Sequence, residues 1–319
     1  MNVPLLTIDE GERADRDAFR RDVLAGLAGS PRAIPAKYLY DARGSALFDA
    51  ICDQPEYYPT RTEAAILRQH ATEIARLAGP GCALVEYGSG SSVKTRLLLE
   101  AMPDLYAYVP IDISRRHLET TAQRLREDYP GLRVDPVTGD YMALDALPDT
   151  IGAARRIGFF PGSTIGNLTP EEAVLFLRRA RRLLRADGAL VLGVDLKKNP
   201  QQLHDAYNDG AGVTAQFTLN LLRRMNRELE ANFDLSGFAH DASYNEAAGR
   251  IEIYFRSLQE QTVTVAGHRF RFAQSERIHT EYSYKYDQAE IAELARRGGF
   301  SLAACWADSQ QLFAVAVLK

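Results

Sequence analysis

The sequence contains few cysteines and no surplus of positive charge. Its three cysteines, Cys52, Cys82 and Cys305, lie far apart and form no CxxC pair. There is thus no sign of a disulfide framework, and a reducing cytoplasm is the expected location. The formal net charge of -4 leaves no overall basic field to attract nucleic acid or an anionic membrane, so we expect neither as a partner.

Long apolar segments and paired metal ligands are also missing from the 319 residues. No apolar run approaches the roughly 18 residues of a membrane span, and the acidic segment 1–19 lacks the apolar core of a signal peptide. The six histidines form no HxxxH or HxH pair, so we expect no metal site. One dense basic run, RRARRLLR (178–185), follows an amphipathic pattern and is predicted to be a solvated helix face.

Helical and strand patterns alternate from about residue 60 to residue 196. The strand-like stretches of this region are 82–87, 107–113, 132–141, 156–166 and 189–196. Two helix starts have capping-box spacing: Thr169 with Glu172, where Pro170 takes the first helical position, and Thr60 with Glu63. This alternation predicts right-handed crossovers and a mostly parallel, doubly wound α/β sheet.

The alternation stops after Asp195 and resumes with a helix at 287–300. The segment between them has a long amphipathic helix followed by β-patterned stretches such as RIEIYFRSL. It is therefore predicted to be an insertion that forms a smaller α+β domain, joined by the start of the chain. The predicted division is a core of 61–196 and 287–319 and a second domain of 1–60 and 197–286.

Three strand ends of the predicted sheet carry residues suited to a nucleoside, and parallel sheets bind ligands at this edge. VEYGSGSSVKT places Gly88 and Gly90 between a strand and a helix, where the backbone can approach a ligand closely. A dinucleotide fingerprint would need glycine at position 93, which is valine. The turn fits instead the amino-acid end of S-adenosylmethionine, although a tight turn without a ligand is the alternative.

Acidic residues follow the next two strands of the predicted sheet. Asp112 ends the second strand, where a carboxylate can accept both ribose hydroxyls. Asp140 and Tyr141 follow the third strand, where they could take the adenine amino group and cover the ring. Each acid could also be only a helix cap, but the three signals in order favour a nucleoside site. In FFPGSTIGNL, Asn167 and the backbone around Gly162 would face the reactive end of the cofactor, unless Asn167 only caps its turn.

Several longer segments closely resemble the family of histidine-specific, S-adenosylmethionine-dependent methyltransferases of ergothioneine biosynthesis. They cover the chain from about residue 30 to its end and are PRAIPAKYLYDARGSALFDAICDQPEYYPTRTEAAIL, VEYGSGSSVKTR, FFPGSTIGNLTP, DLKKNP, AYNDGAGVTAQF, MNREL and IHTEYSYKY. The resemblance implies a Rossmann-like class I methyltransferase sheet with an inserted smaller α+β substrate-binding domain. It also implies S-adenosyl-L-methionine as co-substrate without a metal, and trimethylation of the α-amino group of L-histidine to hercynine. We expect a monomer.

The resemblance also implies roles for individual residues. The positions that match cofactor contacts are Tyr40, Gly88, Lys94, Asp112, Asp140 and Tyr141. Those that match the substrate site are Tyr57, Asn167, Tyr207, Ile253, Glu281 and Ser283, with Asn167 and Tyr207 at the carboxylate and Glu281 and Ser283 at the imidazole. Ile253 departs from the family pattern, in which a methionine lines the pocket. Tyr40 and the Gly162 carbonyl are expected to orient the reacting amine, together with Asn167.

The stretch IHTEYSYKY (278–286) alternates between two faces if it is a strand. Glu281 and Ser283 then share one face with His279 and Lys285, which are predicted to be solvated neighbours. The opposite, tyrosine-rich face is expected to pack on the domain core.

Three other functions compete with this one. The first is N-methylation of another aromatic amino acid such as tryptophan, which Glu281 disfavours because a buried carboxylate needs an N–H partner. The second is a nicotinamide-dependent oxidoreductase, which the missing third glycine disfavours. The third is a protein that binds S-adenosylmethionine without catalysis, which only a test of methyl transfer would separate.

Overall fold

The computed structural model describes residues 10–90 and 93–319, which divide into two compact units. The larger unit comprises Ile51–Asp209, Tyr244–Ile251 and Tyr282–Lys319, and the rest of the chain forms the smaller unit. The predicted second domain, 1–60 and 197–286, therefore extends beyond the smaller unit. Residues 1–9 of this predicted domain lie outside the described residues, as do residues 91–92 of the glycine turn. As an assignment of roles, the predicted division stays a prediction.

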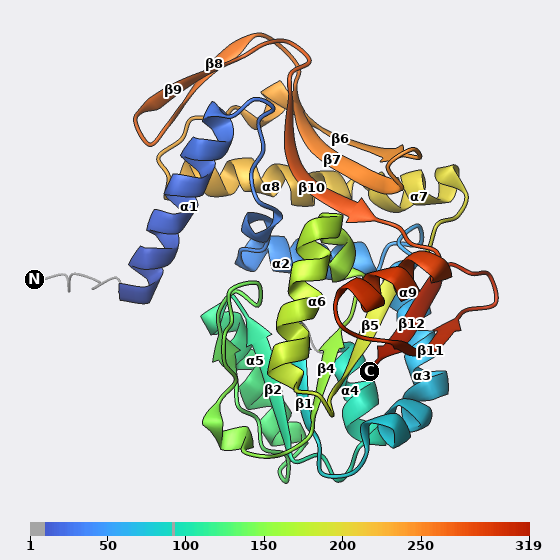
Figure 1. The fold of residues 1–319 in the computed structure, drawn as a ribbon. Helices are drawn as coiled ribbons and strands as arrows, with labels where there is room; N and C mark the ends of the chain where they lie inside the picture. Colours follow the sequence, from blue (N-terminus) through green and yellow to red (C-terminus); the bar gives the residue numbers. More distant parts are fainter. Residues whose placement is uncertain (1–9, 91–92) are drawn as a thin grey trace, which may run out of the picture. The chain divides into compact units, whose positions relative to one another are not determined.

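The larger unit is built on one sheet with the strand order β11-β12-β5-β4-β1-β2-β3 (Figure 1). The strands are β1 (Ala83–Tyr87), β2 (Ala107–Asp112), β3 (Val137–Thr138), β4 (Arg156–Phe160), β5 (Ala189–Asp195), β11 (Leu302–Ala307) and β12 (Phe313–Leu318). Neighbours from β3 to β5 are parallel, and β12 runs antiparallel to both β5 and β11. This arrangement confirms the predicted Rossmann-like α/β sheet. The strand predicted at 132–141 is shorter because Pro136, which has no N–H to donate, interrupts it.

Helices cover both faces of this sheet. One face carries α3 (Pro59–Ala78), α4 (Val93–Ala101) and α5 (Arg115–Asp128), and the other carries α6 (Pro170–Leu184) and α9 (Gln288–Arg297). Neighbouring strand residues point to opposite sides: Leu84 packs in the cluster with α3, whereas Val85 and Tyr87 pack in the cluster with α6. Burial on both faces explains why these strands are mostly apolar, with Glu86 the exception inside β1.

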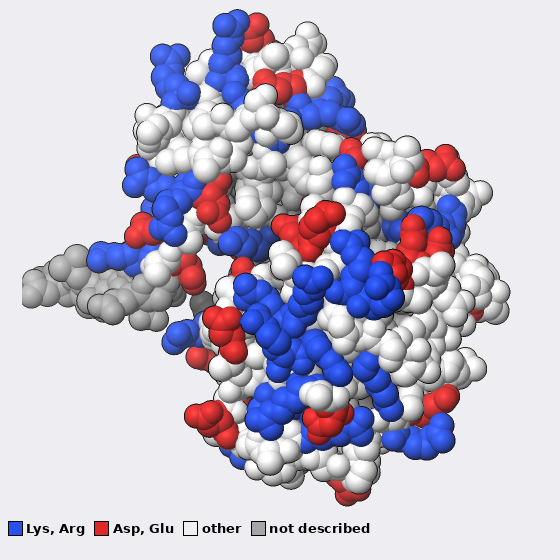
Figure 2. Space-filling model, viewed as in Figure 1, with Lys and Arg blue, Asp and Glu red and all other residues white. Residues whose placement is uncertain are grey.

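The helix starts confirm one capping prediction and contradict another. Thr169 caps α6 in a complete capping box with Glu172 and with proline at the first helical position. The predicted box between Thr60 and Glu63 is wrong, because α3 begins with Pro59 and the side chain of Glu63 is buried. On α6, the basic run 178–185 is a solvated face as predicted: Lys and Arg side chains gather over this helix in Figure 2.

The smaller unit combines helices with antiparallel strands. Its helical elements are α1 (Glu10–Ala28), η1 (Ala36–Leu39), α8 (Val213–Glu228), η4 (Leu235–Gly237) and most of α2 (Ala42–Cys52). Its strands are the hairpin β8 (Gln261–Val265) and β9 (His268–Phe272) and parts of β6 (Phe238–Asn245), β7 (Arg250–Ser257) and β10 (Arg277–Tyr284), which form a sheet in the order β10-β7-β6. The mixed composition agrees with the predicted α+β insertion. None of the helices within the described residues is long and apolar enough to cross a membrane.

The alternation predicted for residues 278–286 fails at Tyr282, Tyr284 and Lys285. Ile278, Thr280 and Tyr286 are buried as expected, but Tyr282 and Tyr284 are only partly buried. Lys285, predicted to be solvated, is buried. His279 is half-buried, with its ring edge-on to that of Tyr254 at 5.3 Å. The tyrosine-rich face is therefore not the one that packs on the core along the whole strand.

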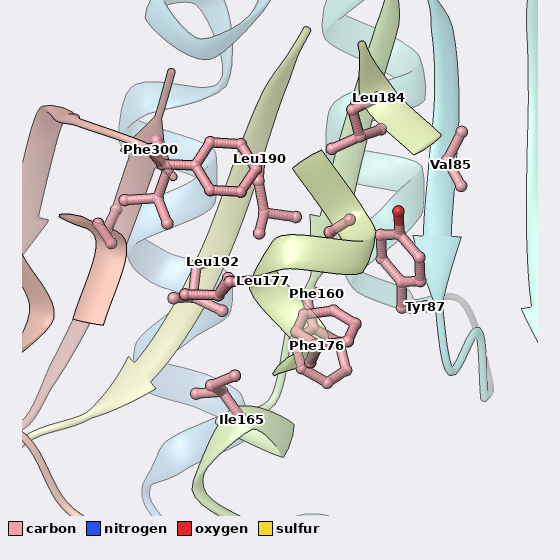
Figure 3. Close-up of a cluster of buried hydrophobic side chains, with 14 of the residues drawn as sticks. Val85, Tyr87, Phe160, Ile165, Phe176, Leu177, Leu184, Leu190, Leu192 and Phe300 are labelled. Carbon is pink, nitrogen blue, oxygen red and sulfur yellow. The ribbon is translucent and has the colours of Figure 1, made fainter. Parts of the chain in front are cut away.

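An aromatic cluster fills the core between the sheet and α6. The rings of Phe160 and Phe176 lie 4.3 Å apart, and Tyr87 meets Phe176 edge-on at 5.2 Å (Figure 3). Tyr141, predicted to cover an adenine ring, packs edge-on against the same two phenylalanines at 5.4 and 5.7 Å. The aromatic cluster therefore extends to Tyr141, a side chain that is predicted to bind the cofactor.

Truncating this cluster should destabilise the larger unit. Phe176→Ala is expected to lower the free energy of unfolding by about 3–5 kcal/mol, because a buried ring is lost and a cavity remains. Urea unfolding followed by the fluorescence of the single tryptophan, Trp306, which stacks on His70 in the same unit, measures this change. The neighbouring Leu175→Ala is the control: this side chain is 52% exposed and should change the free energy by less than about 0.5 kcal/mol. Equal effects of the two variants would contradict this account.

Candidate active site

The glycine turn after β1 lies where the strand order reverses, since β1 pairs with β2 on one side and β4 on the other. Such a switch point is where doubly wound sheets bind ligands. Gly88 has a φ of +76° and donates its N–H to the carbonyl of Ile111 at 2.9 Å. A Cβ on Gly88 would lie 4.0 Å from the Tyr141 ring, and one on Gly90 would meet nothing within 4 Å. There is therefore space for a ligand beside these two glycines, while the amides of Gly88 and Ser89 are bound to the Ile111 carbonyl.

The predicted acids lie at the ends of the two neighbouring strands. Asp112 ends β2 and accepts a hydrogen bond from the Ser114 amide at 2.9 Å. Asp140 follows β3 and accepts one from the Met142 amide at 2.8 Å. Both carboxylates therefore cap their turns, as the alternative without a ligand predicts, and both are only partly buried. An open glycine turn, two carboxylates and an aromatic ring at adjoining strand ends together fit a nucleoside with an amino-acid tail.

A buried carboxylate that sequence patterns did not identify as a site residue, Glu63, joins two of the predicted site residues. Its side chain is 0% exposed and lies 2.5 Å from the ammonium of Lys94. It also accepts the N–H of Gly162 at 2.9 and 3.0 Å. Gly162 has a φ of +75°, and a Cβ on this residue would lie 3.3 Å from the Lys94 ammonium nitrogen. Glu63 was interpreted as a capping residue, and only its place in the family-like block PEYYPTRTE could have indicated more.

Glu86, on β1, is a second buried carboxylate beneath the glycine turn. It accepts hydrogen bonds from Thr95 Oγ1 at 2.7 and 2.8 Å and from the hydroxyl of Tyr108. Burial raises the pKa of Glu86 to about 7, although both hydrogen bonds act in the opposite direction. The group therefore changes its charge close to neutral pH.

The loop between β4 and α6 carries Asn167, the last residue of η3 (Thr164–Asn167). Two close contacts hold this loop in place. The amide of Asp195 donates to Ser163 Oγ at 2.9 Å, and a Cβ on Gly166 would lie 2.7 Å from the Tyr284 carbonyl oxygen. Asn167 is thus attached to a rigid segment of the larger unit.

Three predicted substrate-binding residues lie together in the larger unit. Tyr57 meets Tyr207, the last residue of α7 (Pro200–Tyr207), edge-on at 6.3 Å. The hydroxyls of Tyr207 and Ser283 lie 2.8 Å apart. The ammonium of Lys285 donates to both at 2.8 Å and pairs with Asp195 at 2.7 Å. The buried carboxylate of Asp195 is the physical reason why Lys285 is not solvated.

Asp195 also binds a second lysine and a tyrosine. Lys198 pairs with Asp195 Oδ1, and the hydroxyl of Tyr58 donates to both carboxylate oxygens at 2.9 and 3.0 Å. Burial opposes ionisation of Asp195, but Lys285 and Lys198 outweigh it and hold the pKa of the carboxyl below its usual range. Burial lowers the pKa of Lys198 to about 8. Spacing along the sequence gave no signal for Tyr58, Asp195 or Lys198.

The remaining predicted residues belong to the smaller unit. Tyr40 follows η1 and meets Phe48 and Phe217 edge-on at 5.7 and 5.3 Å. Its neighbour Asp41 is held by Asn220 and Arg227 of α8. Ile253 and Glu281 are buried within β7 and β10. The roles of all these residues stay predictions. Within the described ranges, no group of three or more His, Cys, Asp or Glu side chains could hold a metal.

A family model and two curated relatives agree on one family. Residues 19–319 match the model of a family described as "Histidine-specific methyltransferase, SAM-dependent". The chain is 45% identical over 289 residues to a histidine N-alpha-methyltransferase of Mycolicibacterium smegmatis, covering 88% of this chain and 89% of that protein. It is 32% identical over 285 residues to ergothioneine biosynthesis protein 1 of Neurospora crassa, covering 86% of this chain and 32% of that longer protein. A solved S-adenosylmethionine-dependent methyltransferase of Clostridium acetobutylicum ATCC 824 is 10% identical with a TM-score of 0.49, covering 85% of this chain and 97% of that one.

The pKa of Glu86 predicts how stability depends on pH. The folded protein binds a proton at Glu86 up to about pH 7, whereas the ordinary value of 4.5 applies when unfolded. Stability relative to Glu86→Gln, which cannot ionise, should therefore be greatest below pH 4.5 and fall by about 3 kcal/mol as pH rises past 7. Urea unfolding of both proteins across this range measures the difference, and parallel curves would contradict the raised pKa.

Removal of Glu63 should destabilise the larger unit. Glu63→Ala leaves the Lys94 ammonium and the Gly162 amide without their carboxylate, so we expect a loss of about 2–4 kcal/mol in the free energy of unfolding. Glu73→Ala on the same helix is the matched control, because that carboxylate is 43% exposed in its pairs with His70 and Arg76 and should cost less than about 1 kcal/mol. Similar losses in Trp306-monitored unfolding would show that Glu63 has no special role.

Proposed function

Because the chain belongs to the histidine-specific, S-adenosylmethionine-dependent methyltransferase family, we propose that it trimethylates the α-amino group of L-histidine to hercynine, the first step of ergothioneine biosynthesis. The observation that carries this proposal is the family match over residues 19–319, together with 45% identity to a histidine N-alpha-methyltransferase over most of both chains. The strand order of the larger unit agrees with it.

Residues at the carboxyl edge of the sheet are proposed to bind the cofactor. We propose that Gly88 and Lys94 receive the amino-acid end, Asp112 the ribose, and Asp140 and Tyr141 the adenine. The open turn at Gly88 and the adjoining carboxylates support this. Tyr40 is proposed to lie near the methyl group. When bound, S-adenosylmethionine supplies a methyl group on a positively charged sulfur.

The reacting amine has to be neutral, with its lone pair available. An α-amino group has a pKa of roughly 8 in peptide models, so deprotonation costs little and no strong base is required. The protein can therefore act mainly by positioning, which contributes up to about 7–11 kcal/mol when the geometry is right. We propose that Tyr40, Asn167 and the carbonyl of Gly162 orient the amine, and that Glu63 fixes the Gly162 peptide for this purpose.

Contacts at both ends of the histidine are proposed to hold it in the site. Asn167 and Tyr207 take the carboxylate, Glu281 and Ser283 take the two imidazole nitrogens, Tyr57 lines the pocket and Ile253 packs against the ring. Support comes from the burial of Glu281 and Ile253 and from the hydrogen bond between Tyr207 and Ser283. A tertiary amine has no hydrogen to donate. Holding the ends leaves the nitrogen able to turn between successive transfers.

The broader assignments stay proposals. We propose that 61–196 and 287–319 bind the cofactor and that 1–60 and 197–286 bind the substrate. A monomer is also proposed. The cytoplasm as the location is proposed from the cysteine spacing, and the exclusion of nucleic acid and membrane as partners from the charge of the sequence.

Mass spectrometry tests the activity directly. Incubation with S-adenosylmethionine and each of the twenty amino acids should add three methylene masses to histidine and leave the others unchanged. Absence of methylated histidine would contradict the proposed function. Binding of S-adenosylmethionine without any methyl transfer would favour a non-catalytic binding protein.

A variant tests the imidazole contacts. Glu281→Ala with Ile253→Val should lower kcat/KM for histidine by roughly tenfold to a hundredfold, because a buried hydrogen bond to a charged group is lost, and should relax the choice of ring. Glu260→Ala is the control, because this carboxylate lies just before β8 and is 65% exposed. It should change neither kcat/KM for histidine nor the choice of ring. Unaltered selectivity between histidine and tryptophan in the double variant would overturn the roles of Glu281 and Ile253.

A further inference from the structure

The ammonium group of Lys285 is enclosed in the larger unit next to two proposed substrate-binding side chains. The Lys285 side chain is 0% exposed, and its Nζ lies 2.7 Å from Asp195 Oδ2. The same nitrogen lies 2.8 Å from the hydroxyl oxygen of Tyr207 and 2.8 Å from that of Ser283. An ammonium has three N–H donors and no acceptor. These three contacts therefore use its whole hydrogen-bonding capacity.

The contacts determine how the two hydroxyls behave. The oxygen of Ser283 has two lone pairs, and its hydroxyl has one hydrogen. Lys285 donates to one lone pair, and the hydroxyl of Tyr207, 2.8 Å away, can donate to the other. With both lone pairs used, Ser283 has only its hydrogen to offer a ligand. Ser283 is thus prepared for a hydrogen-bond acceptor.

Asp195 keeps the buried ammonium of Lys285 compensated. This carboxylate pairs with Lys285 and also with Lys198. The hydroxyl of Tyr58 adds a further donor to that carboxylate. With Asp195 as its counter-ion, Lys285 remains charged although it is buried.

We propose that Lys285 is a positioning residue that, together with Tyr207, makes Ser283 act as a hydrogen-bond donor toward the substrate. This inference rests on the proposed function, in which Ser283 contacts the imidazole. The form of histidine that binds is then the one with a neutral imidazole, whose bare nitrogen accepts from Ser283. An imidazolium carries N–H on both nitrogens. One N–H would then face the O–H of Ser283, and two donors do not form a hydrogen bond.

Trimethylhistidine is a suitable probe because its quaternary nitrogen does not titrate. Its imidazole, with a pKa of roughly 6.5, is the ligand group that changes charge between about pH 5 and pH 7.5. We expect the dissociation constant of the wild-type protein, measured by titration calorimetry with S-adenosylhomocysteine present, to rise about tenfold for each pH unit below that pKa.

The ionisable groups within reach of Lys285 should not obscure this dependence. They come from several elements and are Asp195, Lys198, Tyr207 and Tyr244, with Tyr58 bound to Asp195. Glu281, proposed to bind the other imidazole nitrogen, is present in every variant compared, so the difference between variants does not depend on it. Lys285 and Lys198 hold the pKa of Asp195 low against its burial, and burial raises the pKa of each tyrosine. Lys198, with a pKa of about 8, stays mostly charged over the range measured.

Lys285→Met should change both the affinity and its pH dependence. Without the ammonium, Ser283 can accept as well as donate. The dissociation constant should therefore rise about tenfold at pH 7.5, the equivalent of one lost hydrogen bond, and the dependence on pH should flatten. The counter-ion is not orphaned, because Lys198 and Tyr58 still bind Asp195. Ser283→Ala, which changes no charge, should also lose the dependence and serves as the second variant if Lys285→Met does not fold.

Lys198→Met is the matched control. It removes an ammonium from the same carboxylate, but its contacts are with Asp195 and Tyr58 and not with the two hydroxyls. It should keep the wild-type pH dependence and a dissociation constant within about threefold of wild type, since it leaves the donors in place.

Two results would overturn the role of Lys285. One is a wild-type affinity that does not change between pH 5 and 7.5. The other is a Lys285→Met or Ser283→Ala protein with the same pH dependence as Lys198→Met. Failure of the proposed function looks different, because the wild-type protein would then not methylate histidine at any pH in the mass-spectrometric assay.

Discussion

The carboxylate of Asp195 holds together the end of β5 and the segments around it. Its side chain is buried and accepts from Lys285 and from the hydroxyl of Tyr58. Its amide donates to Ser163 Oγ at 2.9 Å, and its carbonyl accepts from the amide of Tyr286 at 3.1 Å. Desolvating such a charge is costly, and removal of one partner destabilises more than the pair contributes. The start of α3, the loop before α6 and the return of the chain to the sheet therefore share one anchor.

A second constraint is the need for glycine where a buried carboxylate approaches the backbone of the sheet. A Cβ on Gly193 of β5 would lie 2.0 Å from Glu63 Oε1, so only glycine at this position lets the carboxylate reach Gly162 and Lys94. Glycine in a strand interior normally weakens the strand. Pairing with neighbours offsets that weakness here, since β12 pairs with residues 190–195 of β5, Gly193 included, and β4 pairs with residues 189–192.

The sheet could be predicted from the sequence because its signals are local. Apolar strands alternate with amphipathic helices, and Asp112 and Asp140 follow from their place after a strand. Errors arose where a distant residue decides the outcome. Period-two spacing puts Lys285 on the face of Ser283, but its burial depends on Asp195, which lies on another strand. Glu63 has the spacing of a cap, yet Pro59 starts the helix earlier and the carboxylate turns inward to Gly162.

The costly polar groups are concentrated at one edge of an otherwise apolar sheet. Glu63, Glu86, Asp195 and Lys285 are buried near strand ends, while the clusters on both faces are apolar. Proteins generally depart from the most stable choice where function requires it. In the proposed reaction the amine changes its hydrogen-bonding capacity with each methyl group, so contacts to that nitrogen cannot hold the substrate throughout. Contacts fixed by a buried ion pair do not change between transfers. A pocket anchored at Asp195 and Lys285 can therefore present histidine and its partly methylated forms in one orientation.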